Sequence, residues 1–256
     1  MSSAAVELGI LAPAFAAGVL VIASHVPMGI QVLARGIVFI DLAIAQVAGL
    51  GVILAGSLGL EPEGWGVQAA ALLAALAGAL FLTWTERRWP EVQEAIIGTT
   101  FVLAASGALL LLAANPHGGE HLRELLVGQI LWVNWSRLVP VALVYAVILA
   151  VWFGYRERLP RIAFYLIFAA AVTLSVQLVG LYLVFASLII PALATHRWRG
   201  SRIAAGYALG AIGYAAGLLA SALFDLPAGA VIVWALALLA VLMFALGGRA
   251  PRAARS

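Results

Sequence analysis

The stretch GIVFIDLAIAQVAGLGVILAG, residues 36–56, decides the fold, because it is apolar almost throughout and long enough to cross a bilayer. A membrane-spanning helix needs about 20 consecutive apolar residues. Two polar side chains interrupt this stretch, the carboxylate of Asp41 and the amide of Gln46. A charge at the centre of a bilayer costs about 2.5–3.5 kcal/mol on insertion scales, so we expect Asp41 to face protein or water rather than lipid.

The rest of the chain repeats this pattern of apolar runs separated by short polar breaks. Of the 256 residues, 65% are hydrophobic and 10% are charged. This composition predicts an all-α polytopic membrane protein with a single domain over residues 1–256. About nine transmembrane helices are expected, with eight or ten as alternatives, at approximately 8–24, 37–57, 65–84, 95–113, 138–154, 162–178, 180–195, 203–223 and 229–246.

The arginines predict the orientation of these spans. Under the nine-span interpretation only Arg123 and Arg137 lie in loops on one side. The loops and tail on the other side carry Arg35, Arg87, Arg88, Arg156, Arg158, Arg161, Arg197, Arg199, Arg202, Arg249, Arg252 and Arg255. The positive-inside rule places the arginine-rich side in the cytoplasm. We therefore expect the N-terminus outside and the tail 247–256 in the cytoplasm.

Residue types that are missing from the sequence exclude several functions. The chain has no cysteine, which excludes disulfides and thiolate metal sites. It also has no lysine, so it cannot form a Walker A loop, and any ATP-driven process needs a partner chain. We expect no covalent cofactor. The net charge of +3 does not indicate nucleic-acid binding, because the arginines sit at helix ends rather than on one face.

Asp41 and Gln46 are the first candidate site residues, and each has a functional and a structural interpretation. Five residues correspond to about 140° around a helix, so the two side chains do not share one stripe. Asp41 either lines a cation path, or reaches the nearby interface, or pairs with Arg35. Gln46 either lines the same path or bonds to a neighbouring helix.

The other polar candidates lie near the ends of the apolar runs. Gln93 and Glu94 open the fourth run, where an acid favours a helix N-terminus, and capping is the simplest interpretation. His117 and His121 stand four residues apart on the outer side, which suits either a weak divalent-cation site or no site. His25 and His196 are interpreted as interfacial residues at helix ends.

The segment 118–137 is too short in its apolar part to span and is bounded by charges, so it predicts an interfacial or re-entrant helix. Gln129 would close a re-entrant turn there. Ser106, in AASGALL, is followed by no general base in a comparable run, and the sequence contains no HExxH motif. An intramembrane hydrolase is therefore disfavoured. Glycines 206, 210, 213 and 217 form overlapping small-xxx-small patterns, which predict closely packed helices.

Five stretches together resemble a known family. ARGIVFIDLAIAQVAGLGV, EAIIGTTFVLAASGALLLL, HLRELLVGQIL, VGLYLVFASLIIPALATH and FDLPAGAVIVW occur in the order seen in the permease subunit of bacterial zinc, manganese and iron ABC importers. The resemblance implies a type II ABC importer permease, like that of the vitamin B12 importer, in the bacterial inner membrane. It also implies a homodimer, cytoplasmic ATPase subunits, and an extracytoplasmic metal-binding protein that delivers the substrate, a divalent metal.

The resemblance also assigns candidate roles and shows three departures. Asp41 and Gln46 fall where the family keeps path-lining polar residues, with Glu94 and Gln129 as secondary candidates. Gln46 stands in the position of a family histidine, Asp41 comes one residue early, and Gln129 replaces an acid. The connection 155–161 is shorter than the family's ATPase-contacting stretch. These departures leave an alternative open, namely a passive channel or assembly factor that is not coupled to an ATPase.

Overall fold

The computed structural model describes residues 3–61, 64–112, 130–155, 160–198 and 200–247. These residues form helices and connections, without a strand among them, which confirms the predicted all-α class. The helices are α1 (Ser3–Arg35), α2 (Ile40–Ser57), α3 (Trp65–Arg88), η1 (Pro90–Val92), α4 (Gln93–Leu112), η2 (Ile130–Trp132), α6 (Trp135–Tyr155), α7 (Arg161–Val179), α8 (Leu181–Ala194), α9 (Arg202–Phe224) and α10 (Ala228–Gly247).

Each of the nine predicted runs has a helical counterpart, but only eight of these helices are long and apolar enough to cross a membrane. The exception is α8, whose 14 residues extend about 21 Å, less than the roughly 30 Å of a hydrocarbon core. α7 and α8 meet at Gly180, which is buried and has a φ of 82°. A left-handed φ favours glycine, so the chain turns there inside the bundle rather than at its surface.

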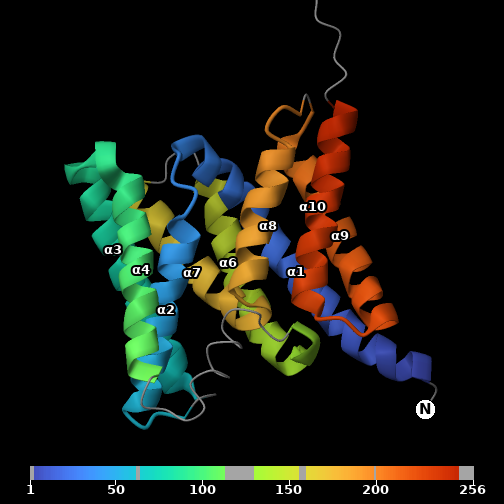
Figure 1. Cartoon of the computed structure of the whole chain (residues 1–256), viewed down its shortest axis with the longest axis horizontal. Helices are drawn as coiled ribbons and strands as arrows, with labels where there is room; N and C mark the ends of the chain where they lie inside the picture. The colour runs from blue at the N-terminus through green and yellow to red at the C-terminus, as the bar shows by residue number, and fades with distance from the viewer. Residues whose placement is uncertain (1–2, 62–63, 113–129, 156–159, 199, 248–256) are drawn as a thin grey trace, which may run out of the picture.

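The first helix differs most from its prediction. α1 has 33 residues and continues through Pro13 and Pro27 to Arg35, whereas the sequence predicted a span over 8–24. At 1.5 Å per residue it extends about 50 Å, and it crosses the bundle at a slant (Figure 1). His25 is therefore inside a helix and fully buried, not at a helix end as expected.

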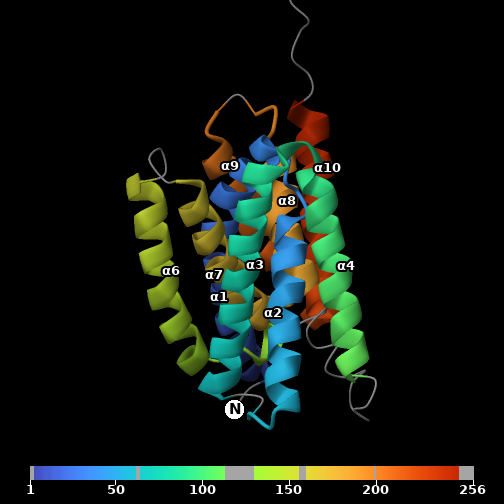
Figure 2. The same ribbon diagram turned by 90° about the vertical axis from the view of Figure 1, so that its left-hand side faces the viewer.

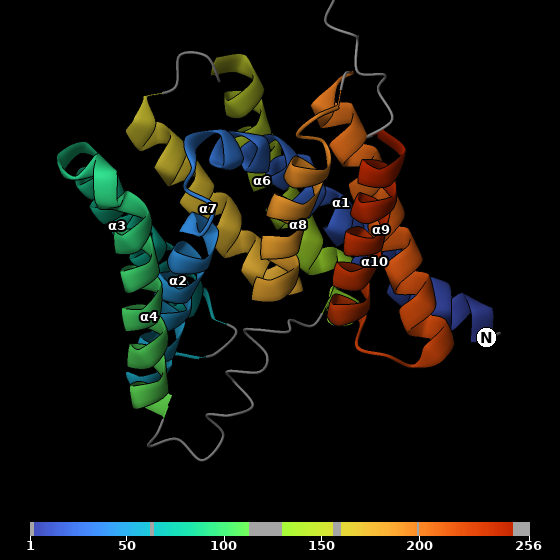
Figure 3. The same cartoon turned by 45° about the horizontal axis from the view of Figure 1, so that its top comes forward.

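The remaining helices gather around α1 and α7. α2, α3 and α4 lie together at one edge, and α9 and α10 lie together at the other (Figures 1 and 3). α8 packs between these groups against α1 and α10, and α6 stands on the far side against α1 and α7 (Figure 2). This arrangement leaves α2 in contact with α3, α4, α7 and α8, so the polar residues of α2 lie at a junction of helices.

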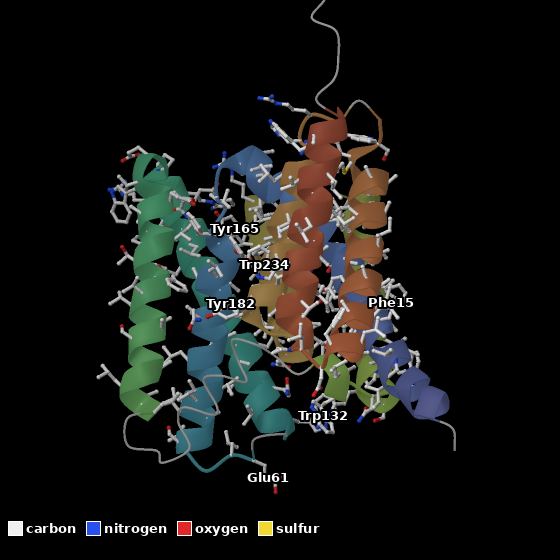
Figure 4. The ribbon with its side chains drawn as sticks, turned by 45° about the vertical axis from the view of Figure 1, so that its right-hand side comes forward. Phe15, Glu61, Trp132, Tyr165, Tyr182 and Trp234 are labelled. Atoms are coloured by element: carbon white, nitrogen blue, oxygen red, sulfur yellow. The ribbon has the colours of Figure 1, made fainter. Side chains whose placement is uncertain are left out.

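The helices alternate in direction, so their ends collect at two opposite ends of the bundle. α1, α3, α6, α8 and α10 finish where α2, α4, α7 and α9 begin. We call this the arginine-rich end, because the described arginines there are Arg35, Arg87, Arg88, Arg161, Arg197 and Arg202. The opposite end holds the start of α1, with Glu61 and Trp132 (Figure 4).

The glycines of α9 pack as their spacing predicts, and they use two faces. A Cβ on Gly206 would lie 2.6 Å from the Val26 side chain of α1, and a Cβ on Gly210 would lie 2.8 Å from the Ile22 side chain of the same helix. A Cβ on Gly213 would clash with the Leu236 side chain of α10, and a Cβ on Gly217 would lie 2.5 Å from the Cα of Ile232 in the same helix. The missing side chains therefore let α9 pack tightly against two helices at once.

Candidate functional site

Asp41 lies in the first turn of α2 and its side chain is 0% exposed. Neither carboxylate oxygen has a hydrogen-bond partner among the described residues. The backbone N–H groups of Asp41 and Leu42 lie beside the carboxylate without reaching hydrogen-bond geometry. The structure thus holds an acidic side chain, at the start of a membrane-spanning helix, that is shielded from solvent and accepts no hydrogen bond from the described residues.

The Asp41 side chain neither reaches out to solvent nor pairs with Arg35. A group that reached the interface would be exposed, and Asp41 is buried. Arg35 does not pair with it, because the Arg35 guanidinium lies over the Phe164 ring of α7, 4.0 Å from the centroid. Arg35, the arginine nearest to Asp41 in the sequence, therefore makes a cation–π contact and does not neutralise the Asp41 carboxylate.

Gln46 lies deeper in α2 and is half-buried, and its amide makes no hydrogen bond within the described part of the chain. The predicted bond to a neighbouring helix is therefore not formed there. Phe39 precedes Gln46 by seven residues and shares its side of α2. The Phe39 ring stacks on Phe185 of α8, with centroids 6.4 Å apart. Leu50, one turn after Gln46, lies against Gly107 of α4, so this side of α2 faces both α8 and α4.

Glu94 caps a helix, but not the one that the sequence indicated. Its Oε1 accepts a hydrogen bond from the backbone N–H of Phe39, 3.4 Å away, which is the N-cap residue of α2 rather than of α4. Its Oε2 is buried and without a partner in the described residues. Glu94 and Asp41 thus bring two carboxylates to the first turn of α2.

Gln93 likewise does not cap its own helix. Its Nε2 donates to the carbonyl of Leu82, 3.0 Å away, and its Oε1 accepts from the Thr85 hydroxyl, also at 3.0 Å. These bonds fasten the start of α4 to the last turns of α3. The capping prediction for this residue is wrong, because a bond across the α3–α4 corner replaces it.

The remaining candidates do not assemble into a metal site. Gln129, His117 and His121 lie outside the described residues, as does most of the segment 118–137. Of that segment, residues 130–132 form η2 and residues 135–137 begin α6. In the part of the chain that is described, no three acidic or histidine side chains are grouped closely enough to hold a metal ion.

Ser106 behaves as a structural hydroxyl. It donates to the carbonyls of Val102, at 2.7 Å, and Leu103, at 3.2 Å, within its own helix. A serine nucleophile instead needs a general base within hydrogen-bond reach. The geometry therefore gives an intramembrane hydrolase no support.

A buried polar group around His25 was missed by the sequence interpretation. His25 Nδ1 donates to the carbonyl of Val21 at 3.0 Å and lies 2.9 Å from Ser24 Oγ, whereas Nε2 is buried without a partner in the described chain. Ser24 also lies close to Tyr145 of α6, whose hydroxyl contacts Ser175 of α7. The only available signal was Ser-His between two apolar runs, which we interpreted as the end of a span.

Comparison with known proteins places this bundle in a family. The profile of the ABC 3 transport family matches residues 7–165 and 154–247. The structure resembles PsaBC from Streptococcus pneumoniae in complex with Fab, with 22% identity, a TM-score of 0.73, and coverage of 92% of this chain and 90% of that chain. It also resembles an inward-facing ABC transporter described as of the metal-chelate type, with 15% identity, a TM-score of 0.64, and coverage of 92% and 84%.

At these identities the two structures show a shared fold, and the family profile carries the assignment. The two matched ranges together extend over nearly all of the chain, including the α2 segment that holds Asp41 and Gln46. The all-helical membrane bundle is consistent with both matches. The chain therefore belongs to the ABC-3 transport family and is a membrane-embedded ABC transporter permease.

Proposed function

We propose that this permease carries a divalent metal ion, zinc or manganese, inward across the bacterial plasma membrane as part of an ABC importer. The observation that carries the proposal is the buried Asp41 carboxylate, for which the described part of the chain supplies no hydrogen-bond donor. Such a group is costly in a folded protein unless something compensates its charge. A passing cation is a compensating partner that the apolar surroundings do not provide.

The proposal gives the site residues different roles. Asp41 attracts or coordinates the cation, and Gln46 lines the path on the side of α2 that faces α4 and α8. Glu94 and Gln129 are secondary ligands, and His117 with His121 forms an outer contact. Carboxylate and imidazole groups suit manganese and zinc. A path needs only weak, exchangeable binding, so an incomplete ligand set in one chain is compatible with transport.

The proposal includes partners that complete the transporter. A homodimer would place two copies of Asp41 and Gln46 along one route. Because the chain has no lysine for a Walker A loop, ATP would act only through cytoplasmic ATPase subunits. An extracytoplasmic protein would deliver the metal. The arginine-rich end would face the cytoplasm, as the positive-inside rule requires.

Substitution of Asp41 tests the proposal. We expect Asp41→Asn to lower uptake of radioactive zinc or manganese by about tenfold or more, because it removes the charge that attracts the cation. Membrane abundance, measured by immunoblot, should stay unchanged. The matched control is Asp225→Asn, since Asp225 is exposed in the turn between α9 and α10 and asparagine tolerates its φ of 51°. Wild-type uptake by Asp41→Asn would remove this residue from the mechanism.

A second measurement separates the importer from a passive channel. In membranes that hold the permease with its ATPase, an ATPase variant that cannot hydrolyse ATP should abolish uptake. Uptake that continues with the inactive ATPase, and that still requires Asp41, would instead support a passive route through the same site.

A further inference from the structure

An open groove of about 600 Å³ lies between α3 and α4, with α2 as its floor. Its lining includes Val47 and Leu50 from α2, Phe81 from α3, and Ile96 and Leu103 from α4. These helices lie side by side at one edge of the bundle (Figures 1 and 3). Asp41, Gln46 and Glu94 are not among the residues that line the groove.

The groove presents an apolar surface in spite of its two threonines. The Thr99 and Thr100 hydroxyls donate to the carbonyls of Ala95 and Ile96 in the preceding turn of α4, both at 2.8 Å. Their hydrogen-bonding capacity is thus used within the helix. From Ala95 to Ala104 the groove follows α4 for about 14 Å, close to the depth of one leaflet of a roughly 30 Å hydrocarbon core. An extended acyl chain matches both the chemistry and the length.

Aromatic and basic side chains continue the groove wall to the arginine-rich end. Phe81, Trp84 and Arg88 occupy one stripe of α3, at positions i, i+3 and i+7. The Phe81 and Trp84 rings are 6.2 Å apart, and Trp84 meets Trp89 edge-on at 5.2 Å. Both tryptophans are exposed, as is usual for residues at the headgroup level of a membrane. The stripe therefore leads from the acyl depth to the headgroup depth.

Two exposed arginines, Arg87 and Arg88, stand at this rim. They form no ion pair with the described residues, whereas Glu86 beside them pairs with Arg161 at 3.9 Å. Glu91 is an exposed acid on the same rim and offsets one of the two positive charges. Two of the three exposed charges at the rim are therefore positive, whereas the nearby Glu94 is half-buried and its Oε1 accepts a hydrogen bond from the backbone N–H of Phe39 in the direction of α2.

We propose that this groove binds one anionic phospholipid from the leaflet at the arginine-rich end, with an acyl chain between α3 and α4 and its phosphate at Arg87 and Arg88. Basic side chains attract anionic headgroups at a membrane surface. An apolar helix from a second copy would fit the groove equally well but would leave the arginine pair without a counter-charge. The charge at the rim therefore favours the lipid.

Lipid binding to the full-length chain tests the proposal. The purified chain is exchanged into detergent with phosphatidylglycerol or with phosphatidylcholine of the same acyl chains, and bound lipid is measured by native mass spectrometry. We expect tighter retention of phosphatidylglycerol, and about fivefold weaker retention for each arginine removed in Arg87→Gln and Arg88→Gln. Glu91→Gln should act in the opposite direction and tighten it.

Two further variants locate the lipid. Arg197→Gln removes an exposed arginine from the same end of the bundle, away from the groove, and should leave retention unchanged. Ala95→Trp places a bulky ring on an exposed wall position, so it should block the groove and reduce retention of both lipids without lowering the melting temperature. Phosphatidylglycerol with a photoreactive acyl chain should label residues 92–104.

Three results would overturn the proposal. The first is equal retention of the two lipids by the unmodified chain. The second is unchanged phosphatidylglycerol retention after loss of both Arg87 and Arg88. The third is efficient disulfide cross-linking between two copies of Ala95→Cys in native membranes. Since the chain has no cysteine of its own, such a cross-link would show that a second copy occupies the groove.

Discussion

At the scale of single residues, the proposed function depends most on the carboxylate of Asp41. Asp41 is buried at the start of α2 and accepts no hydrogen bond from the described residues. Arg35, the nearest arginine in the sequence, instead makes a cation–π contact with Phe164. A residue selected for stability alone would have a partner or be apolar. An acidic group that is buried without a hydrogen-bond partner in the described residues is typical of a functional group that is retained at the expense of stability.

We predict that Asp41→Asn stabilises the isolated permease while it impairs transport. The amide keeps the shape of the side chain and cannot ionise, so the cost of burying an acidic group is removed and the free energy of unfolding should rise by on the order of 1 kcal/mol. The measurement is the melting temperature of the metal-free protein in detergent. The exposed Asp225→Asn should leave it unchanged, and a lower melting temperature for Asp41→Asn would show that its carboxylate is stabilised by a contact in the folded state.

Glu94 gives a second prediction, because it acts on a helix other than its own. Glu94→Ala should remove the cap of α2 and destabilise the fold by about 1 kcal/mol. The specific readout is hydrogen–deuterium exchange, which should become faster in the first turn of α2, residues 40–43. Glu91→Ala removes an exposed acid nearby and is the control. Unchanged exchange in the first turn of α2 would mean that the Glu94–Phe39 bond contributes nothing to that helix.

Residue patterns predicted some of these features and could not predict others. The apolar run around Asp41 was enough to predict that this residue faces protein or water rather than lipid, and the structure buries it. The partner of Glu94 is 55 residues away and depends on how α4 packs against α2, which no local pattern encodes. Gln93 is similar, since its bonds to Leu82 and Thr85 exist only because the chain turns back at η1.

The element scale shows where hydropathy gives correct boundaries and where it fails. The runs at 37–57 and 203–223 agree with α2 and α9 within a few residues, because charged or polar residues flank them. α1 continues for eleven residues beyond its predicted end, since Ser24, His25 and Pro27 interrupt the apolar pattern without breaking the helix. Burial of those polar groups against α6, α7 and α8 depends on tertiary packing, which the linear sequence does not show.

The two faces of α9 lead to a third prediction. Gly217→Ala would place a Cβ 2.5 Å from the Cα of Ile232, so α9 and α10 must separate. We expect a loss of about 1–3 kcal/mol in the free energy of unfolding, seen as a lower melting temperature. Gly98→Ala in α4 is the control, because nothing lies within 4 Å of its added methyl and alanine favours a helix. Equal melting temperatures for the two variants would contradict the close packing of α9 on α10.

At the scale of the whole molecule, Asp41 and Glu94 lie at the same end of the bundle as most of the described arginines. α2 begins at the arginine-rich end, so Asp41 and Glu94 lie there with the arginines at the ends of α1 and α3 and the start of α7. The phospholipid groove opens toward the same end. If that end faces the cytoplasm, Asp41 stands near the exit of an inward path and the lipid belongs to the inner leaflet.

Single-cysteine labelling tests this orientation, and the cysteine-free chain is suited to it. Glu61→Cys lies at the end opposite the arginines and should react with a membrane-impermeant maleimide in intact cells (Figure 4). Arg197→Cys, at the arginine-rich end, should react only after the membrane is permeabilised, because arginine-rich loops are retained in the cytoplasm. Both positions are exposed, so equal labelling of detergent-solubilised protein is the control. The reverse pattern would place Asp41 near the entrance of the path, and the metal would then meet this carboxylate first rather than last.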